Sequence, residues 1–260
     1  MKGLPRWLVE VALPPLLLAA IVLVAWDRLV VWSGVPAFRL PRPGQVWDAA
    51  TDAKNRQALF SATQLTAAAA LAGFAVSLVL GTLVALVFAQ SRWVRRAAFP
   101  YTIFLQTVPI VAIAPLVIKW CGTGFTSVVV VAATISVFPI ITNVTAGLLA
   151  VEPNLLDLLA AYNASRLQVL LKLRLPNAVP HLVTGAKIAC GLAVIGAIVG
   201  EFYAGSGESF GLGYLIPLAS GQLKTDYLFA AVICSTLLGM AIFALVSLIG
   251  ATILARWHVK

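Results

Sequence analysis

The stretch DLLAAYNASRLQVLLKLRLPNAVP, residues 157–180, lies between two long apolar runs and determines how many membrane spans the chain has. Leu and Ala dominate it, as they would in another span. It nevertheless carries charges, which are costly at the centre of a bilayer, at Asp157, Arg166, Lys172 and Arg174. We therefore interpret the stretch as helical structure on the membrane surface and not as a span.

Turn and cap signals divide this stretch into two helices. Asn154 can cap the first helix, and Asn163 favours a turn because Asn tolerates a left-handed backbone better than most residues other than Gly. Ser165 can then cap a second helix. Pro176 is expected to end that helix, and Pro180 to lie in the first turn of the next span. The sequence thus predicts a helix, a turn and a helix over about 154–176.

The composition of the whole chain is that of an integral membrane protein. Hydrophobic residues make up 61% of it, charged residues only 10%, and the mean hydropathy is +1.00. Soluble domains carry about 25% charged residues. The uncharged runs are long and continuous, whereas the strands of membrane barrels alternate over about ten residues. The prediction is an all-α integral membrane protein, with residues 1–260 forming a single transmembrane domain.

Length sets the number of spans, because a helix needs about 20 apolar residues to cross the hydrocarbon layer. By that criterion we expect about six transmembrane helices, at 11–32, 66–90, 98–118, 125–149, 180–202 and 227–254. An uncleaved first span is simpler than a signal peptide, because no small-residue cleavage site follows it. Two short helices are also expected, an amphipathic one from about Gln45 and a re-entrant or interfacial one at about 212–220.

The net charge of +9 has two explanations, nucleic-acid binding and membrane topology. The basic residues are unevenly distributed between the two sides of the membrane, which favours the explanation by membrane topology. A cytoplasmic N-terminus places ten of them inside and six outside. The ten are Lys2, Arg6, Arg92, Arg95, Arg96, Arg166, Lys172, Arg174, Arg256 and Lys260. We therefore expect a multi-pass protein of the cell (inner) membrane with both termini in the cytoplasm, embedded in the lipid bilayer and without a nucleic-acid partner.

Polar and kinked positions within the spans are candidates for a translocation pathway. Pro109 and Pro115 lie mid-membrane in the third span, where each removes a helical hydrogen bond, and such breaks are tolerated where they line a cavity. The candidate pathway residues are Gln106, Thr107, Pro109, Thr134, Phe138, Asn143 and Glu201. A packing kink with internally satisfied polar groups explains the kinked third span equally well.

Glu201, at the end of the fifth span, has two open interpretations. A carboxylate buried in the membrane is costly and is therefore a functional candidate. At the outer end of a helix the same carboxylate could simply be solvated, which is the interpretation we prefer.

The absence of several motifs narrows the range of possible functions. There is no G-x-x-x-x-G-K-[ST] phosphate loop and no His/Cys cluster at metal spacing, so we expect no cofactor, metal site or catalytic residue in this chain. No pair of acidic residues lies within a span, as a proton-coupled carrier often requires. This disfavours two alternatives, an ion-coupled secondary transporter and an intramembrane enzyme.

The surface stretch resembles the cytoplasmic loop of ABC importer permeases. That loop reads E-A-A, three residues, Gly, nine residues, Ile-x-Leu-Pro; here Asp157 stands for the acid, Asn163 for the glycine, and LRLP at 173–176 for the closing motif. The segments PIVAIAPLVIKWCGTG, FPIITNVTAGL and GEFYAGSGESFGLGYLI are similar to the branch that imports nitrate, sulfonates, taurine and pyrimidine precursors. The resemblance covers most of residues 45–255, although the acidic triplet and the glycine are substituted.

The resemblance implies a fold and a set of partners. It implies a type I ABC importer permease, the membrane-spanning subunit of an ATP-driven solute importer. Two permease copies would pair, a separate ABC ATPase subunit would hydrolyse ATP, and an extracytoplasmic solute-binding protein would deliver the solute. The helix at about 155–162 would dock into the ATPase, with coupling residues Asp157, Tyr162, Asn163, Arg166 and Pro176. Lys172 and Arg174 are expected to face lipid headgroups or to fix the topology.

Overall fold

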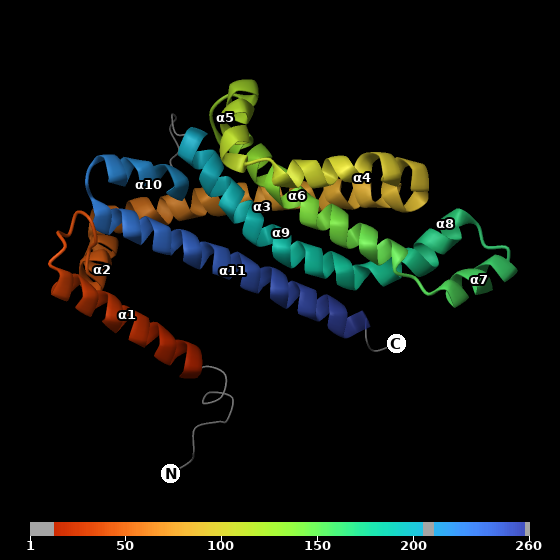
Figure 1. The fold of residues 1–260 in the computed structure, drawn as a ribbon, viewed down its shortest axis with the longest axis horizontal. Helices are drawn as coiled ribbons and strands as arrows, with labels where there is room; N and C mark the ends of the chain where they lie inside the picture. Colours follow the sequence, from red (N-terminus) through yellow and green to blue (C-terminus); the bar gives the residue numbers. More distant parts are fainter. Residues whose placement is uncertain (1–12, 205–210, 258–260) are drawn as a thin grey trace, which may run out of the picture. The chain divides into compact units, whose positions relative to one another are not determined.

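The computed structural model describes residues 13–204 and 211–257, and these ranges hold helices and no strand (Figure 1). The all-α prediction is therefore confirmed. The elements are α1 (Leu13–Ser33), α2 (Pro43–Thr51), α3 (Ala53–Gln90), α4 (Arg92–Thr107), α5 (Ile110–Cys121), α6 (Phe125–Leu149), α7 (Pro153–Ala161), α8 (Arg166–Val169), the π-helical turn η2 (Leu170–Arg174), α9 (Leu175–Ala204), α10 (Leu212–Gly221) and α11 (Thr225–Trp257). Lys2, Arg6 and Lys260, which carry part of the topology argument, lie outside the described residues.

The predicted spans correspond to long apolar helices. Among the residues that the structure describes, five helices are long and apolar enough to cross a membrane, and α4 with α5 makes a sixth span if this bent pair is counted as one. The two short helices expected near Gln45 and at 212–220 are α2 and α10. The sequence therefore located the apolar helices well, and the differences concern how two of them are broken or extended.

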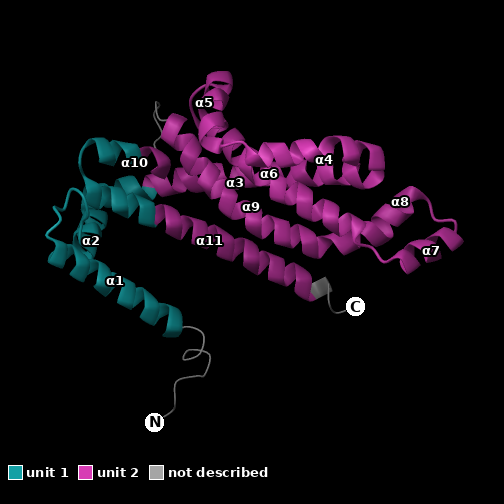
Figure 2. Ribbon diagram, viewed as in Figure 1, with its two compact units in different colours: residues 1–60, 216–233 teal, residues 61–215, 234–260 magenta. Residues whose placement is uncertain are grey.

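The chain forms two compact units (Figure 2). Unit 1 comprises residues 1–60 and 216–233, and unit 2 comprises residues 61–215 and 234–260. A single domain over the whole chain stays a prediction.

In unit 1, the loop that follows α1 is hydrogen-bonded to α1. The guanidinium of Arg42 donates from Nε and Nη2 to the two carboxylate oxygens of Asp27, at 2.9 and 3.1 Å. The rings of Trp26 and Phe229 pack at a centroid distance of 5.5 Å, which brings the start of α11 against the same part of α1. Asp27, a charge within the first predicted span, is thus paired.

Unit 2 is centred on α6, which packs along α9 (Figure 1). Small residues allow this close approach, because without a Cβ two backbones can touch. A Cβ at Gly73 of α3 would lie 2.5 Å from the Cβ of Ala132, and one at Gly196 of α9 would lie 2.7 Å from its Cα. Ala132 is completely buried between these two glycines. The centre of the unit is therefore held by backbone contact among α3, α6 and α9.

The third predicted span, 98–118, is broken rather than kinked. Its two halves, α4 and α5, are bent by 99° at Val108 and Pro109. A residue before proline is forced out of the helical region, and Val108 accordingly has φ −69° and ψ 125°. Pro109 lacks an N–H and becomes the cap of α5. Pro115, by contrast, is accommodated inside α5.

Three of the predicted positions in the surface stretch are wrong. Pro180 does not lie in the first turn of a helix, because α9 begins at Leu175 and holds this proline in its interior. Pro176 does not end a helix, because α8 continues through η2 into α9 and Arg166–Ala204 is one helix. The π-helical turn shifts the hydrogen-bond register just before the proline, with Leu175 N–H donating to Leu170 O, so that the missing N–H is accommodated. Asn154 is not the cap of the first helix either: Glu152 takes that position and Pro153 begins α7.

Candidate functional site

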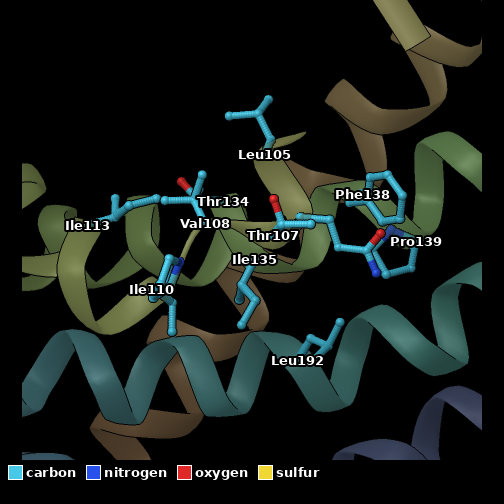
Figure 3. Close-up of a pocket in the computed structure, with 12 residues that line it drawn as sticks. Leu105, Thr107, Val108, Ile110, Ile113, Thr134, Ile135, Phe138, Pro139 and Leu192 are labelled. Atoms are coloured by element: carbon cyan, nitrogen blue, oxygen red, sulfur yellow. The ribbon is translucent and has the colours of Figure 1, made fainter. Parts of the chain in front are cut away.

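A cavity of about 360 Å³ lies at the break between α4 and α5 (Figure 3). Gln106 and Thr107 come from the last turn of α4, and Pro109 from the break itself. Thr134 and Phe138 come from α6, where they are four residues apart and so lie on one helix face. Leu192 of α9 closes one side (Figure 3). The structure thus brings together five of the seven predicted pathway residues.

The polar groups of this cavity are neutral and partly satisfied by their own helices. Thr107 Oγ1 donates to Phe104 O at 2.8 Å, and Thr134 Oγ1 donates to Val130 O at 2.7 Å. Their oxygens keep the capacity to accept a hydrogen bond from a bound molecule. Among the described residues that line the cavity, no side chain carries a charge. The cavity can therefore offer acceptors, an amide and an aromatic ring, but no ion pair.

Asn143 is not brought to the cavity. Its side-chain amide donates to Pro139 O at 2.8 Å, one turn earlier on α6. A Cβ at Gly185 would lie 3.1 Å from the Cβ of Asn143, so α9 passes close to this position. The geometry places Asn143 in the packing of α6 against α9.

Glu201 is the second predicted pathway residue that lies elsewhere, and it is buried, with 5% of the residue exposed. Its Oε2 atom accepts hydrogen bonds from Thr66 Oγ1 of α3 and from Gly213 N–H of α10, both at 2.9 Å. Thr66 Oγ1 in turn accepts from Leu212 N–H at 2.9 Å. The preferred interpretation, a solvated carboxylate, is therefore wrong, because Gly213 N–H and the Thr66 hydroxyl donate to the carboxylate in place of water.

This network caps α10, a role that the sequence analysis missed. The first N–H groups of a helix have no partner within it, and a negative charge there is favourable. Two glycines make room for the carboxylate: a Cβ at Gly211 would overlap the carboxylate of Glu201, and one at Gly213 would overlap Ile198 O and crowd the Cβ of Glu201. The signal in the sequence was the pair Gly211 and Gly213, about ten residues after Glu201 in the last turn of α9.

The turn after α7 has the predicted left-handed residue. Asn163 has φ 53°, and its N–H donates to Ala160 O at 2.9 Å. Ala164 N–H donates to Leu159 O at 2.9 Å, which completes a Schellman motif. Ser165 then caps α8, where its side chain accepts from Gln168 N–H and Gln168 accepts from Ser165 N–H. Asn163 therefore retains the turn despite replacing the glycine.

The predicted coupling residues lie on an open surface, Pro176 excepted. None of the residues of α7 is buried. Asp157 and Arg166 are exposed, and Tyr162 at the end of α7 is 78% exposed. Leu158 is also exposed. A short helix that ends in a fixed turn and shows apolar and charged side chains is suited to contact another protein. Pro176 lies beyond it, in the first turn of α9.

Comparisons with known proteins identify the family. The model of the binding-protein-dependent transport system inner membrane component matches residues 77–258. The riboflavin transport system permease protein RibX of Chloroflexus aurantiacus is 36% identical over 238 residues, which cover 92% of this chain and 87% of the relative. The formylaminopyrimidine transport permease protein ThiX of Halalkalibacterium halodurans is 32% identical over 249 residues, which cover 96% of this chain and 97% of the relative.

A solved structure supports the fold. An inward-facing conformation of the MetNI methionine ABC transporter matches with a TM-score of 0.56 at 18% identity, covering 84% of this chain and 98% of that chain. The type I importer architecture is thus shared, as the resemblance implied. The chain belongs to the family of binding-protein-dependent transport system inner membrane components, the membrane-spanning permease subunits of ABC importers.

Proposed function

We propose that the cavity at the α4–α5 break is part of the path that the solute takes, and that α7 receives the motion of the ATPase. The family supplies the general role, an inner-membrane permease subunit that works with an ATPase. The observation that carries the proposal is the 99° break, which lines one cavity with Gln106, Thr107, Thr134 and Phe138. Non-helical backbone at membrane depth is tolerated where it is buried in protein or lines a water-filled cavity.

The orientation and the remaining partners are part of the proposal. We place α7 in the cytoplasm, with both termini on that side, an extracytoplasmic solute-binding protein at the opposite face and a second copy of this chain completing the pathway. Charge supports this orientation, because Lys and Arg are enriched in cytoplasmic loops. In unit 2, basic residues gather at the start of α4 and along α8 and η2, which follow α7 and line one hollow with the start of α4: Arg92, Arg95, Arg96, Arg166, Lys172 and Arg174.

The solute is proposed to be a small molecule of the nitrate, sulfonate, taurine or pyrimidine type. The names of relatives cover riboflavin, formylaminopyrimidine, aliphatic sulfonates and taurine. The described side chains that line the cavity carry no positive charge that would favour an anionic solute and no negative charge that would repel one. Selection among these solutes would then rest with the binding protein.

Uptake into proteoliposomes tests the pathway. The permease is reconstituted with its ATPase and binding protein, and Thr134→Phe is introduced to fill the cavity. We expect solute uptake to fall at least tenfold while ATP hydrolysis without solute persists. Thr252→Phe makes the same change at an exposed position of α11 that does not line the cavity, and is expected to transport normally. Normal uptake by Thr134→Phe would remove the cavity from the pathway.

The same assay addresses the ion-coupled alternative, which the family assignment does not support. Uptake that requires ATP and survives collapse of the ion gradients agrees with an importer. Uptake that continues without ATP and is abolished by an ionophore would contradict the proposed function.

A further inference from the structure

A second hollow, of about 270 Å³, lies where α3 ends, α4 begins and the chain enters α8. All three charged residues that line it are arginines: Arg92 of α4, Arg166 of α8 and Arg174 of η2. Ala89 and Gln90, the last residues of α3, complete one wall. We call this site the arginine hollow.

Hydrogen bonds fix Arg174 itself and the helix starts that carry Arg92 and Arg166. Arg174 is half-buried, and its Nη1 donates to Ala89 O at 2.8 Å, across the hollow from its own element. A guanidinium has five N–H donors, so this bond leaves donors for an anion. Arg166 and Arg92 each follow a capping serine, Ser165 and Ser91, whose side-chain oxygen accepts an N–H from the first turn of the helix.

The arginine hollow has no acidic counterpart of its own. No Asp or Glu is among the described residues that line it. The one ion pair that the described part of the chain contains joins Arg42 to Asp27, far from the hollow in the sequence and in unit 1. Three guanidinium groups around one space repel one another, and this repulsion grows as the site is shielded from water. An anion that bridges them removes the repulsion, and a phosphate suits guanidinium groups because it accepts paired hydrogen bonds.

The surroundings favour a phospholipid as the source of that phosphate. The hollow lies where the apolar helix α3 ends, and the end of a membrane-spanning helix is expected at the depth of the lipid headgroups. Trp93, next to Arg92, is 85% exposed, and Trp concentrates at the membrane–water interface. Leu167 and Leu171, which flank the lining residues of α8 and η2, are exposed and offer apolar surface for acyl chains. Basic pockets between membrane helices are known to bind anionic headgroups.

We propose that the arginine hollow binds the headgroup phosphate of an anionic phospholipid. The bound phosphate would link the end of α3 and the start of α4 to Arg166, which lies directly after the α7–α8 turn. The lipid would therefore hold the segment that carries α7 at a fixed place on the membrane surface.

Lipid binding to the purified full chain tests this directly. Native mass spectrometry in detergent counts the phosphatidylglycerol molecules retained by the wild type and by Arg92→Gln plus Arg166→Gln. Both arginines are exposed, so their replacement is expected to leave the fold intact. We expect the double variant to bind phosphatidylglycerol at least tenfold more weakly, because it lacks two of the three guanidinium groups that would bind the phosphate. The wild type is expected to prefer phosphatidylglycerol over phosphatidylcholine.

Arg95→Gln plus Arg96→Gln is the control for charge, since it also removes two arginines, both from positions of α4 that do not line the hollow. Three outcomes would overturn the proposal. The first is equal loss of phosphatidylglycerol in both double variants, which would indicate diffuse attraction. The second is inorganic phosphate binding to the wild type without any retained lipid. The third is unchanged lipid binding by the Arg92→Gln plus Arg166→Gln variant. If that variant also loses the co-purifying ATPase, the hollow would instead bind acidic groups of that subunit.

Discussion

Thr66 and Glu201, 135 residues apart in the sequence, are joined by a buried hydrogen bond of 2.9 Å from Thr66 Oγ1 to Glu201 Oε2. Both side chains also bind N–H groups at the start of α10, so three helices meet at one carboxylate. A buried polar network of this kind holds its elements in a single arrangement only while every member is present.

Thr66→Val is expected to loosen α10. Valine has nearly the same shape as threonine but neither donates to Glu201 nor accepts from Leu212 N–H, and leaving such buried groups unpaired costs about 1–3 kcal/mol. The apparent midpoint of thermal unfolding in detergent should fall. Thr142→Val is the control, because the hydroxyl of Thr142 donates only to carbonyls of α6, Phe138 O and Pro139 O. If the two variants unfold at the same temperature, the network does not hold α10.

Asn163→Gly and Asn163→Val are expected to behave differently. The φ of 53° at Asn163 is open to glycine, whereas a β-branched residue there is strained by about 1–3 kcal/mol. The valine variant should distort the turn after α7 and lower the ATP hydrolysis that solute stimulates in the reconstituted importer, while the glycine variant retains it. Equal stimulation in both variants would show that the turn geometry does not matter for coupling.

Signals that reside in a few neighbouring residues could be predicted from the sequence. The left-handed turn at Asn163 and the cap at Ser165 depend on the backbone preferences of single residues and on partners within five positions. The apolar helices follow from composition over about 20 residues. Pro109 indicated a break in the third span for the same local reason, although the 99° bend depends on how α5 packs against α6 and α9.

Features that depend on distant elements were missed. Glu201 was judged by its position at a helix end, but its burial depends on Thr66 and on α10, which folds over it. Pro176 was judged by its missing N–H alone, and the register shift in η2 accommodates it. The arginine hollow joins residues from α4, α8 and η2, so no spacing in the sequence marks it.

Gly196→Ala and Gly191→Ala separate close packing from helix propensity within one helix. A Cβ at position 196 would lie 2.7 Å from Ala132 Cα, whereas one at position 191 would meet nothing within 4 Å. Overpacking costs about 1–3 kcal/mol, so Gly196→Ala should lower the unfolding midpoint. Gly191→Ala should leave the midpoint unchanged or raise it, because alanine favours a helix by about 1 kcal/mol over glycine. A stable Gly196→Ala variant would show that α6 and α9 can move apart without cost.

Asp157→Lys plus Tyr162→Ala is expected to abolish co-purification with the ATPase subunit. Tyr162 is 78% exposed on this chain, and large aromatic side chains often supply much of the binding energy at protein interfaces. Asp157 is an exposed charge on the same short helix, and reversing it would place like charges together if the ATPase offers a basic group.

The paired control is Asp48→Lys plus Trp47→Ala, which makes the same kind of change on exposed positions of α2. With the N-terminus placed in the cytoplasm, α2 follows the first span and would be extracytoplasmic, so that variant should retain the ATPase. Loss of the ATPase in the control as well would indicate general damage to the permease, and retention in the α7 variant would mean that the ATPase docks elsewhere.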